Sequence, residues 1–267
     1  MPALLTRRAR LIFGATLLLS VGCATPPSSS VRLRSPVSAL PPPSPIAPRT
    51  IVVDAGHGGR DPGTSHYGLQ EKNLTLDIAR RLRAELASRG MNSVMTRDRD
   101  EFIALSRRPD VANDMAADLF VSVHINANRN RRVSGVEVYY PRESVISGSV
   151  PFPPGIESVE VATPTLTIKQ ILWDLVLTRS RRGSTRMASH ICRALRDQLG
   201  VPCRGVRGAR FVVLREARMP AVLVEVGYVT NRPEAARLGT VSYRQAIAQA
   251  IANGVISYLR EQGSPTT

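Results

Sequence analysis

Aromatic residues are scarce in this 267-residue chain: Phe, Trp and Tyr make up only 4% of it, although 43% of the residues are hydrophobic. A core must therefore be built from Val, Leu, Ile and Ala, as a packed α/β domain allows. The scarcity also argues against nucleic-acid binding, because no basic motif is interleaved with aromatic side chains. The length fits one large domain with accessory segments.

Cysteine is also rare, with three in the whole chain. Cys192 and Cys203 belong to no Cys-x-x-Cys pattern, so the sequence gives little support to a thiolate metal site. An oxidising compartment would permit a disulfide between them, and the sequence alone does not decide whether it forms.

The N-terminal apolar stretch, from Leu11 to Leu19, is too short to cross a bilayer as a helix. It follows three arginines, which is typical of a secretory signal, here over residues 1–22. Cys23 follows Ser20-Val21-Gly22, which resembles a bacterial lipobox with Ser20 in place of the usual leucine. We predict a lipid on Cys23 that anchors a periplasmic protein to the outer membrane. The alternative is an ordinary signal peptide with an incidental cysteine.

Acidic residues are too few to balance the basic ones: 21 Asp and Glu face 36 Lys and Arg, for a net charge of +15. An anionic partner is expected, and an exported chain meets the cell wall and lipid head groups before nucleic acid. Residues 23–48 are rich in Pro and Ser and have too few large apolar groups to fold, so they are predicted to be a linker.

Beyond the linker, strand-like apolar runs alternate with segments of helical period. Strands are predicted at residues 51–55, 92–96, 118–125, 135–140, 211–214 and 221–226, and helices at 73–89, 105–115, 165–178, 184–199 and 243–259. This alternation predicts a single α/β domain with a twisted, mainly parallel sheet that helices cover on both faces. The domain is expected to span 49–262, with the proline-rich segment 141–182 as an insertion.

Two predicted strands run into a histidine. In IVVDAGHGG (51–59), His57 stands among glycines that let the backbone turn sharply, and in FVSVHINAN (120–128) a second strand leads into His124. Ligands of parallel sheets gather beyond the carboxyl ends of the strands, so both histidines are expected at one edge. A structural histidine in a tight turn is the alternative for His57.

Two glutamates occupy positions that call for an explanation. Glu71 begins the first long helix, where the helix dipole alone would favour a carboxylate, but a His/His/Glu set is also a standard shell for catalytic zinc. Glu225 interrupts the apolar strand AVLVEV, where an unpaired carboxylate would cost several kcal/mol. It is either paired with an arginine or a general base beside a metal-bound water.

These residues and their flanking motifs resemble the zinc-dependent N-acetylmuramoyl-L-alanine amidases. The matching motifs follow one another in the family's order over roughly residues 50–260: DAGHGGRDPG (54–63), Glu71, TRDRDEFIALSRRPDVAN (96–113), SVHINA (122–127), GVEVYY (135–140) and LVEVGYVTN (223–231). The resemblance implies one Zn²⁺ per chain, held by His57, Glu71 and His124, with Glu225 serving the reaction. Thr64, Ser65 and the YVT of the last motif depart from the usual pattern and bear on substrate detail.

The implied reaction is hydrolysis of the amide between N-acetylmuramic acid and L-alanine in peptidoglycan, in wall remodelling or daughter-cell separation. Asp54 is then a candidate acceptor for an imidazole N–H or a brace for the loop, and Asn126 is a further candidate beside the metal or substrate. Two alternatives are a carboxypeptidase-type zinc peptidase of peptidoglycan and a non-catalytic wall-binding regulator.

The insertion also resembles a regulatory segment. Residues 169–184 (KQILWDLVLTRSRRGS) are similar to the helix that plugs the zinc site of cell-division amidases of this family until an activator protein displaces it. In that case Asp174 could reach the metal. The alternative is a helix that only packs, through Ile171, Leu172 and Leu175.

Overall fold

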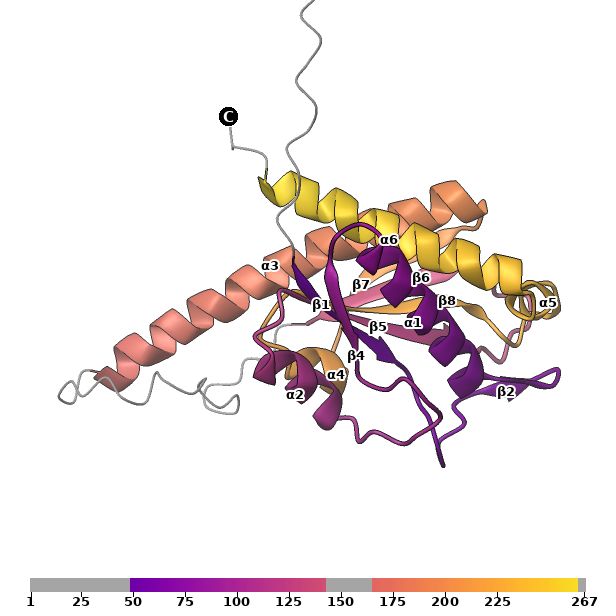
Figure 1. Cartoon of the computed structure of the whole chain (residues 1–267), viewed down its shortest axis with the longest axis horizontal. Coiled ribbons are helices and arrows are strands. Elements are labelled where there is room, and N and C mark those ends of the chain that lie inside the picture. The colour runs from indigo at the N-terminus through magenta and orange to yellow at the C-terminus, as the bar shows by residue number, and fades with distance from the viewer. Residues whose placement is uncertain (1–48, 143–164, 264–267) are drawn as a thin grey trace, which may run out of the picture. The chain divides into compact units, whose positions relative to one another are not determined.

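The structure, a computed structural model, describes residues 49–142 and 165–263 (Figure 1). The predicted signal segment, Cys23 and the linker at 23–48 lie outside these residues, as do the side chains of residues 165–174. No helix of the described part combines the length and apolar character needed to span a membrane.

A six-stranded sheet forms the centre of the domain, in the order β4-β1-β5-β8-β6-β7. Four strands run parallel to one another: β4 (Asn92–Met95), β1 (Thr50–Ala55), β5 (Leu119–Asn126) and β8 (Ala221–Tyr228). The remaining pair, β6 (Val136–Pro141) and β7 (Cys203–Ala209), are parallel to each other, but β6 is antiparallel to β8. The prediction of a mainly parallel sheet is therefore confirmed.

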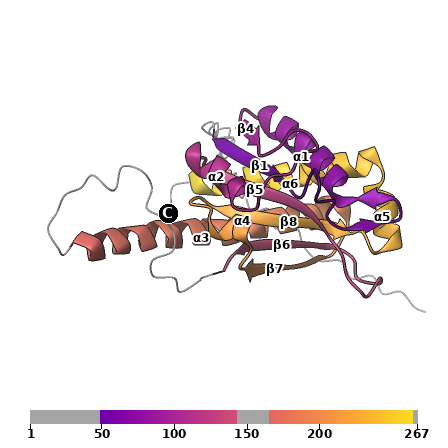
Figure 2. The ribbon, with the colours of Figure 1, turned by 90° about the horizontal axis from the view of Figure 1, so that it is seen from below.

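Helices cover both faces of this sheet (Figure 2). One face packs through Ile51, Val53 and Val121 against α1 (Glu71–Ala87), α3 (Thr165–Leu199) and α6 (Val241–Gly263). The other packs through Val52, Phe120 and Leu223 against α2 (Arg107–Asp114) and α4 (Val212–Arg215). The remaining elements are the short helix α5 (Arg232–Leu238) and the small β2–β3 ribbon (Ser65–His66, Leu69–Gln70).

Polar side chains replace apolar ones where the strands approach the site. Side chains alternate between the two faces of a strand, so every second residue of β1, β5 and β8 lies on the α2/α4 face. On that face Val52, Phe120 and Leu223 are buried in the core cluster. The next positions along the same face are polar: Asp54, Ser122, His124 and Glu225.

The prediction of a strand at 211–214 is wrong, because this segment forms the short helix α4. A four-residue apolar run has no periodicity that separates a strand from a buried helical turn. The strand that does form nearby, β7, was missed because its sequence, CRGVRGA, has two glycines and two arginines and lies at the sheet edge.

The two helices predicted at 165–178 and 184–199 are one continuous helix, the 35-residue α3. Gly183 does not break it: a Cβ at this position would lie 2.8 Å from Pro220 and from the Tyr258 hydroxyl, so close packing selects the glycine. Cys192 of α3 forms a disulfide with Cys203 at the start of β7, with 5.8 Å between the two Cα atoms.

Candidate active site

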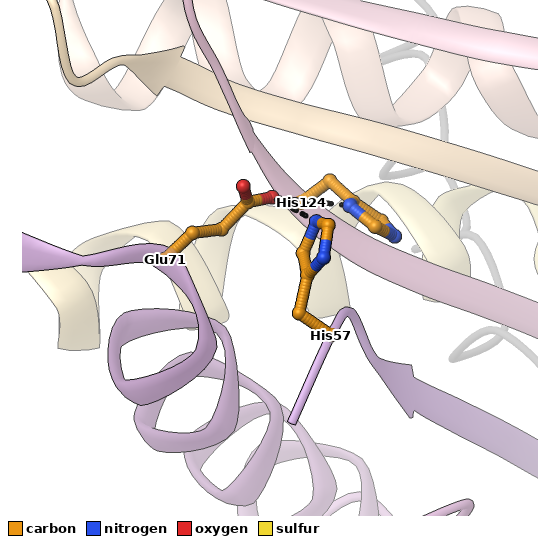
Figure 3. Close-up of side chains that lie close together, drawn as sticks. All are labelled: His57, Glu71 and His124. Atoms are coloured by element: carbon orange, nitrogen blue, oxygen red, sulfur yellow. Dashed lines mark hydrogen bonds and ion pairs between the residues drawn. The ribbon is translucent and has the colours of Figure 1, made fainter. Parts of the chain in front are cut away.

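Three side chains from separate elements meet at the carboxyl ends of β1 and β5 (Figure 3). His57 comes from the loop after β1, Glu71 from the first residue of α1, and His124 from β5. One possible ligand atom of each lies within 4.8 Å of the others. Ligand bonds of about 2.0–2.2 Å to zinc would place such atoms roughly 3–4 Å apart, so the set fits one ion.

Glu71 stands between the two imidazoles. Its Oε1 lies 3.1 Å from His57 Nε2 and 3.1 Å from His124 Nδ1. Backbone N–H groups of Ile125 and Thr64 each donate to this carboxylate at 2.9 Å. Burial raises the pKa of Glu71, but the hydrogen bonds and charges of His124 and His57 outweigh it and lower the pKa to about 2. The carboxylate is therefore ionised and fixed in position.

Asp61 orients the ring of His57. The Nδ1 of His57 lies 2.8 Å from Asp61 Oδ2, which leaves Nε2 directed at Glu71. Burial lowers the pKa of His57, but Glu71 and Asp61 outweigh it and raise the pKa to about 8. A carboxylate on the far nitrogen is the usual support of a metal-binding histidine. Sequence reasoning missed Asp61, although its position four residues after His57 was visible.

The hydrogen-bond partners of Asp54 among the described residues are two hydroxyl groups and an arginine, not an imidazole. Asp54 is fully buried and accepts hydrogen bonds from Thr96 and Ser122, both at 2.6 Å, and from Arg108 at 2.9 Å. Burial raises the pKa of Asp54, but the Arg108 charge and the two hydroxyl donors outweigh it and lower the pKa.

Two buried arginines hold the loop that carries His57. Arg108 donates to the carbonyls of Ala55 at 2.7 Å and His57 at 2.8 Å, and Arg97 donates to that of Gly56 at 2.7 Å. This support matters because His57 has a φ of 60°, a left-handed conformation that non-glycine residues rarely adopt. Both arginines belong to the segment 96–113 that the sequence analysis matched to the family without assigning them a role.

Two glycines leave room for the ligand side chains. A Cβ on Gly56 would lie 2.5 Å from His124 Cε1, and a Cβ on Gly63 would lie 2.5 Å from Glu71 Oε2 and 2.7 Å from His57 Cδ2. Neither clash can be relieved without moving a candidate ligand. These glycines are therefore part of the site.

Glu225 lies beside this group. It is the direct neighbour of His124 across the β5–β8 pairing. Its Oε2 is buried and has no hydrogen-bond partner among the described residues, and within the same part of the chain it forms no ion pair with an arginine. Burial raises the pKa of Glu225 to about 7, with the Glu71 and Glu137 charges adding to the effect and the histidines opposing it. A buried acid that is half ionised near neutral pH is suited to proton transfer.

Asn126 of β5 reaches across the end of β8 to a residue of β6. Its Nδ2 donates to Glu137 Oε2 at 3.2 Å, and its Oδ1 accepts from the Ala127 N–H at 2.8 Å. It therefore contacts Glu137, a buried acid that the sequence analysis did not single out.

The family described as N-acetylmuramoyl-L-alanine amidase matches residues 51–257. The chain belongs to this family. It is 37% identical over 219 residues to the amidase AmiA of Salmonella typhimurium. This match covers 79% of this chain and 76% of AmiA. It is 34% identical over 217 residues to LytC of Bacillus subtilis, a match that spans 81% of this chain and 37% of LytC.

Solved structures of amidases of the family have the same fold. AmiC2 of Nostoc punctiforme superposes with a TM-score of 0.63 at 32% identity, covering 79% of this chain and 97% of that one. An amidase of Clostridium difficile 630 superposes with a TM-score of 0.65 at 29% identity, covering 81% and 99%. The chain is thus an N-acetylmuramoyl-L-alanine amidase, a hydrolase that cleaves an amide bond of peptidoglycan. This selects the amidase over the carboxypeptidase and the non-catalytic regulator.

Replacing Arg108 by methionine is expected to lower the free energy of unfolding of this amidase by about 3–5 kcal/mol, because it leaves the Asp54 carboxylate buried without its charge partner. Urea unfolding measures the change. Arg107→Met is the matched control, since the Arg107 side chain is 65% exposed and its pair with Asp110 is a surface one. Equal losses in the two variants would contradict the bracing role of Arg108.

Replacing Gly63 by alanine is expected to weaken metal binding at least about tenfold, because the added methyl group displaces Glu71 and His57. Gly68→Ala is the control: Gly68 also has a positive φ, 77°, but a Cβ there would meet nothing within 4 Å. Competitive titration with a chelator measures both affinities. If the two variants have equal affinity for the metal, the packing argument for Gly63 is wrong.

Proposed function

We propose that His57, Glu71 and His124 hold one Zn²⁺ and that Glu225 is the general base of the amidase reaction. Two imidazoles and a carboxylate are a donor set that catalytic zinc sites use, with one position left open. The observation that carries the proposal is the convergence of these three donors within 4.8 Å. The buried Glu225 Oε2, which has no partner among the described residues, supplies the acid beside them.

When bound, Zn²⁺ supplies Lewis acidity that polarises the carbonyl of the scissile amide and acidifies water. Glu225 takes the proton of the attacking water on its carboxylate and returns it to the amine of L-alanine as that group leaves. Glu71 is held by two backbone N–H groups and His57 by Asp61, so neither side chain reorganises during the reaction. The products are a free stem peptide and a glycan without it.

Glu225→Gln is expected to lower the rate of stem-peptide release from purified sacculi about 10²- to 10⁴-fold, because the amide cannot accept the proton. The variant should keep its zinc, whereas His124→Ala should lose zinc and activity together. Mass analysis of the released peptides and metal analysis of the proteins provide the two readouts. If the Glu225 variant releases peptides at the wild-type rate, Glu225 is not the base.

We further propose that the chain is exported to the periplasm and that a lipid on Cys23 anchors it to the outer membrane. The linker at 23–48 would then let the domain reach peptidoglycan, and the anchor would be its only contact with the membrane. Replacing Cys23 by serine should release the protein into the soluble fraction of the cell envelope. A protein with no acyl group on its first mature residue, found by mass spectrometry, would rule out the anchor.

For regulation, we propose that the 141–182 insertion restrains the site until an activator protein binds it. The proposal rests on the resemblance of residues 169–184 to the plugging helix. Leu175, the first residue of α3 whose side chain is described, lines a cavity with Thr178, Arg49 and Pro220; Arg49 precedes β1 and Pro220 precedes β8. The parallel strands begin at this edge of the sheet, and the proposed metal ligands lie at the opposite edge, where the strands end. The proposal therefore requires the N-terminal part of α3 to move to a second position at the metal site.

Deleting residues 150–174 is expected to raise basal activity on sacculi severalfold. This deletion keeps Leu177, which is buried, and Ser180, which donates to the Arg218 carbonyl at 3.1 Å, so the rest of α3 retains its packing. Circular dichroism checks that the variant is folded. Unchanged or lower activity in a folded variant would argue against a restraining insertion and against a role for Asp174 at the metal.

A further inference from the structure

The face of the sheet that carries the metal ligands continues to the edge strand β7. His124, Glu225 and Glu137 are successive partners across β5, β8 and β6. The next pairing places Gly205 of β7 beside Glu137 and Arg207 beside Tyr139. Paired residues point to the same face of a sheet, so Glu137 and Arg207 extend the row that begins at the metal ligand His124.

Glu137 is a buried carboxylate with one oxygen fully engaged. The residue is 5% exposed, and its Oε2 accepts hydrogen bonds from the Tyr139 hydroxyl at 2.6 Å and from Asn126 at 3.2 Å. Burial and the Glu137 charge raise the pKa of Tyr228 to about 12. Burial and the hydrogen bond to Glu137 also raise the pKa of Tyr139, so both tyrosine hydroxyls stay protonated.

The other oxygen of Glu137 faces two arginines. Oε1 lies 3.6 Å from Arg204 Nε and 3.7 Å from Arg207 Nη1. These separations allow electrostatic attraction but are too long for good hydrogen bonds. Glu137 therefore draws both guanidinium groups to the site without using their N–H donors in strong bonds.

Both guanidinium groups remain accessible from solvent. The side chains of Arg204 and Arg207 are 38% and 56% exposed. Within the described part of the chain, Arg204 donates to the Ser134 carbonyl and Arg207 to the Arg204 carbonyl, each at a weak 3.4 Å. Gly205 lets Arg207 fold back over the strand, since a Cβ there would lie 3.2 Å from Arg207 Nε. Two positive charges against one negative charge leave the cluster cationic.

We propose that Arg204 and Arg207 form a subsite that binds a carboxylate of the peptide part of the substrate. This inference rests on the proposed function of the neighbouring metal centre. Guanidinium groups pair with carboxylates through parallel N–H donors, and the cluster has such donors to offer. Both guanidinium groups face Glu137 of β6, which lies two strand spacings, about 10 Å, from the metal ligand His124 of β5, and an extended peptide spans about 3.3–3.6 Å per residue. The carboxylate therefore lies two or three residues from the scissile bond.

The test uses two muramyl tripeptides with a glutamate as second residue, which differ only in whether the carboxylates of the second and third residues are all free (the acid) or all amidated (the amide). Wild-type enzyme loaded with zinc is expected to cleave the free acid with a kcat/KM about tenfold higher, mainly through KM. The double variant Arg204→Gln/Arg207→Gln should have a lower kcat/KM for the acid, equal to the value for the amide. Its kcat/KM for the amide should equal that of the wild type. The control Arg193→Gln/Arg196→Gln removes two positive charges from exposed positions of α3, as many as the double variant loses.

A second readout separates the subsite from catalysis. Calorimetry measures binding of the released peptides, acid and amide, to the same proteins, and the acid should bind about tenfold more tightly only where both arginines are present. If wild-type protein cleaves neither tripeptide but still prefers the acid peptide, the proposed function fails and the subsite stands. The subsite would be overturned if the wild type bound the acid and the amide peptide with equal affinity. It would also be overturned if the double variant lost affinity for both peptides by the same factor.

Discussion

The Glu71 carboxylate, buried between two imidazoles, is the contact on which the rest of the site depends. Burying this charge without partners would be costly, and four groups compensate for it: the two histidines and the backbone N–H groups of Ile125 and Thr64. A divalent cation bound by the same three side chains would add to this compensation. Helix α1 begins at Glu71, so the positive end of its dipole acts in the same sense.

That contact requires a loop held in an unfavourable conformation. His57 adopts a positive φ, and the hydrogen bonds of the buried Arg97 and Arg108 to the loop carbonyls stabilise it. Asp54 balances the charge of Arg108 within the core. The geometry of the candidate metal site and the stability of the core are therefore coupled in this domain, because one ion pair under the loop serves both.

The sequence predicted the parts of the site that follow from strand ends. His57 and His124 follow apolar strands, and Glu225 interrupts one, so each departs visibly from a buried pattern. Arg97, Arg108 and Asp61 could not be assigned, because nothing in their local pattern shows which carbonyls or rings they will face after folding. Glu137 was missed for a topological reason: β6 runs antiparallel to β8, so its first residues lie at the edge where β5 and β8 end.

X-ray absorption at the zinc edge tests the central claim most directly, because it reports the number and type of ligands of the bound ion. The account predicts one zinc per chain with two imidazole nitrogens and oxygen ligands at about 2.0–2.2 Å, and loss of one oxygen ligand and of affinity in Glu71→Ala. A spectrum with sulfur ligands, with one imidazole, or unchanged in that variant would contradict it.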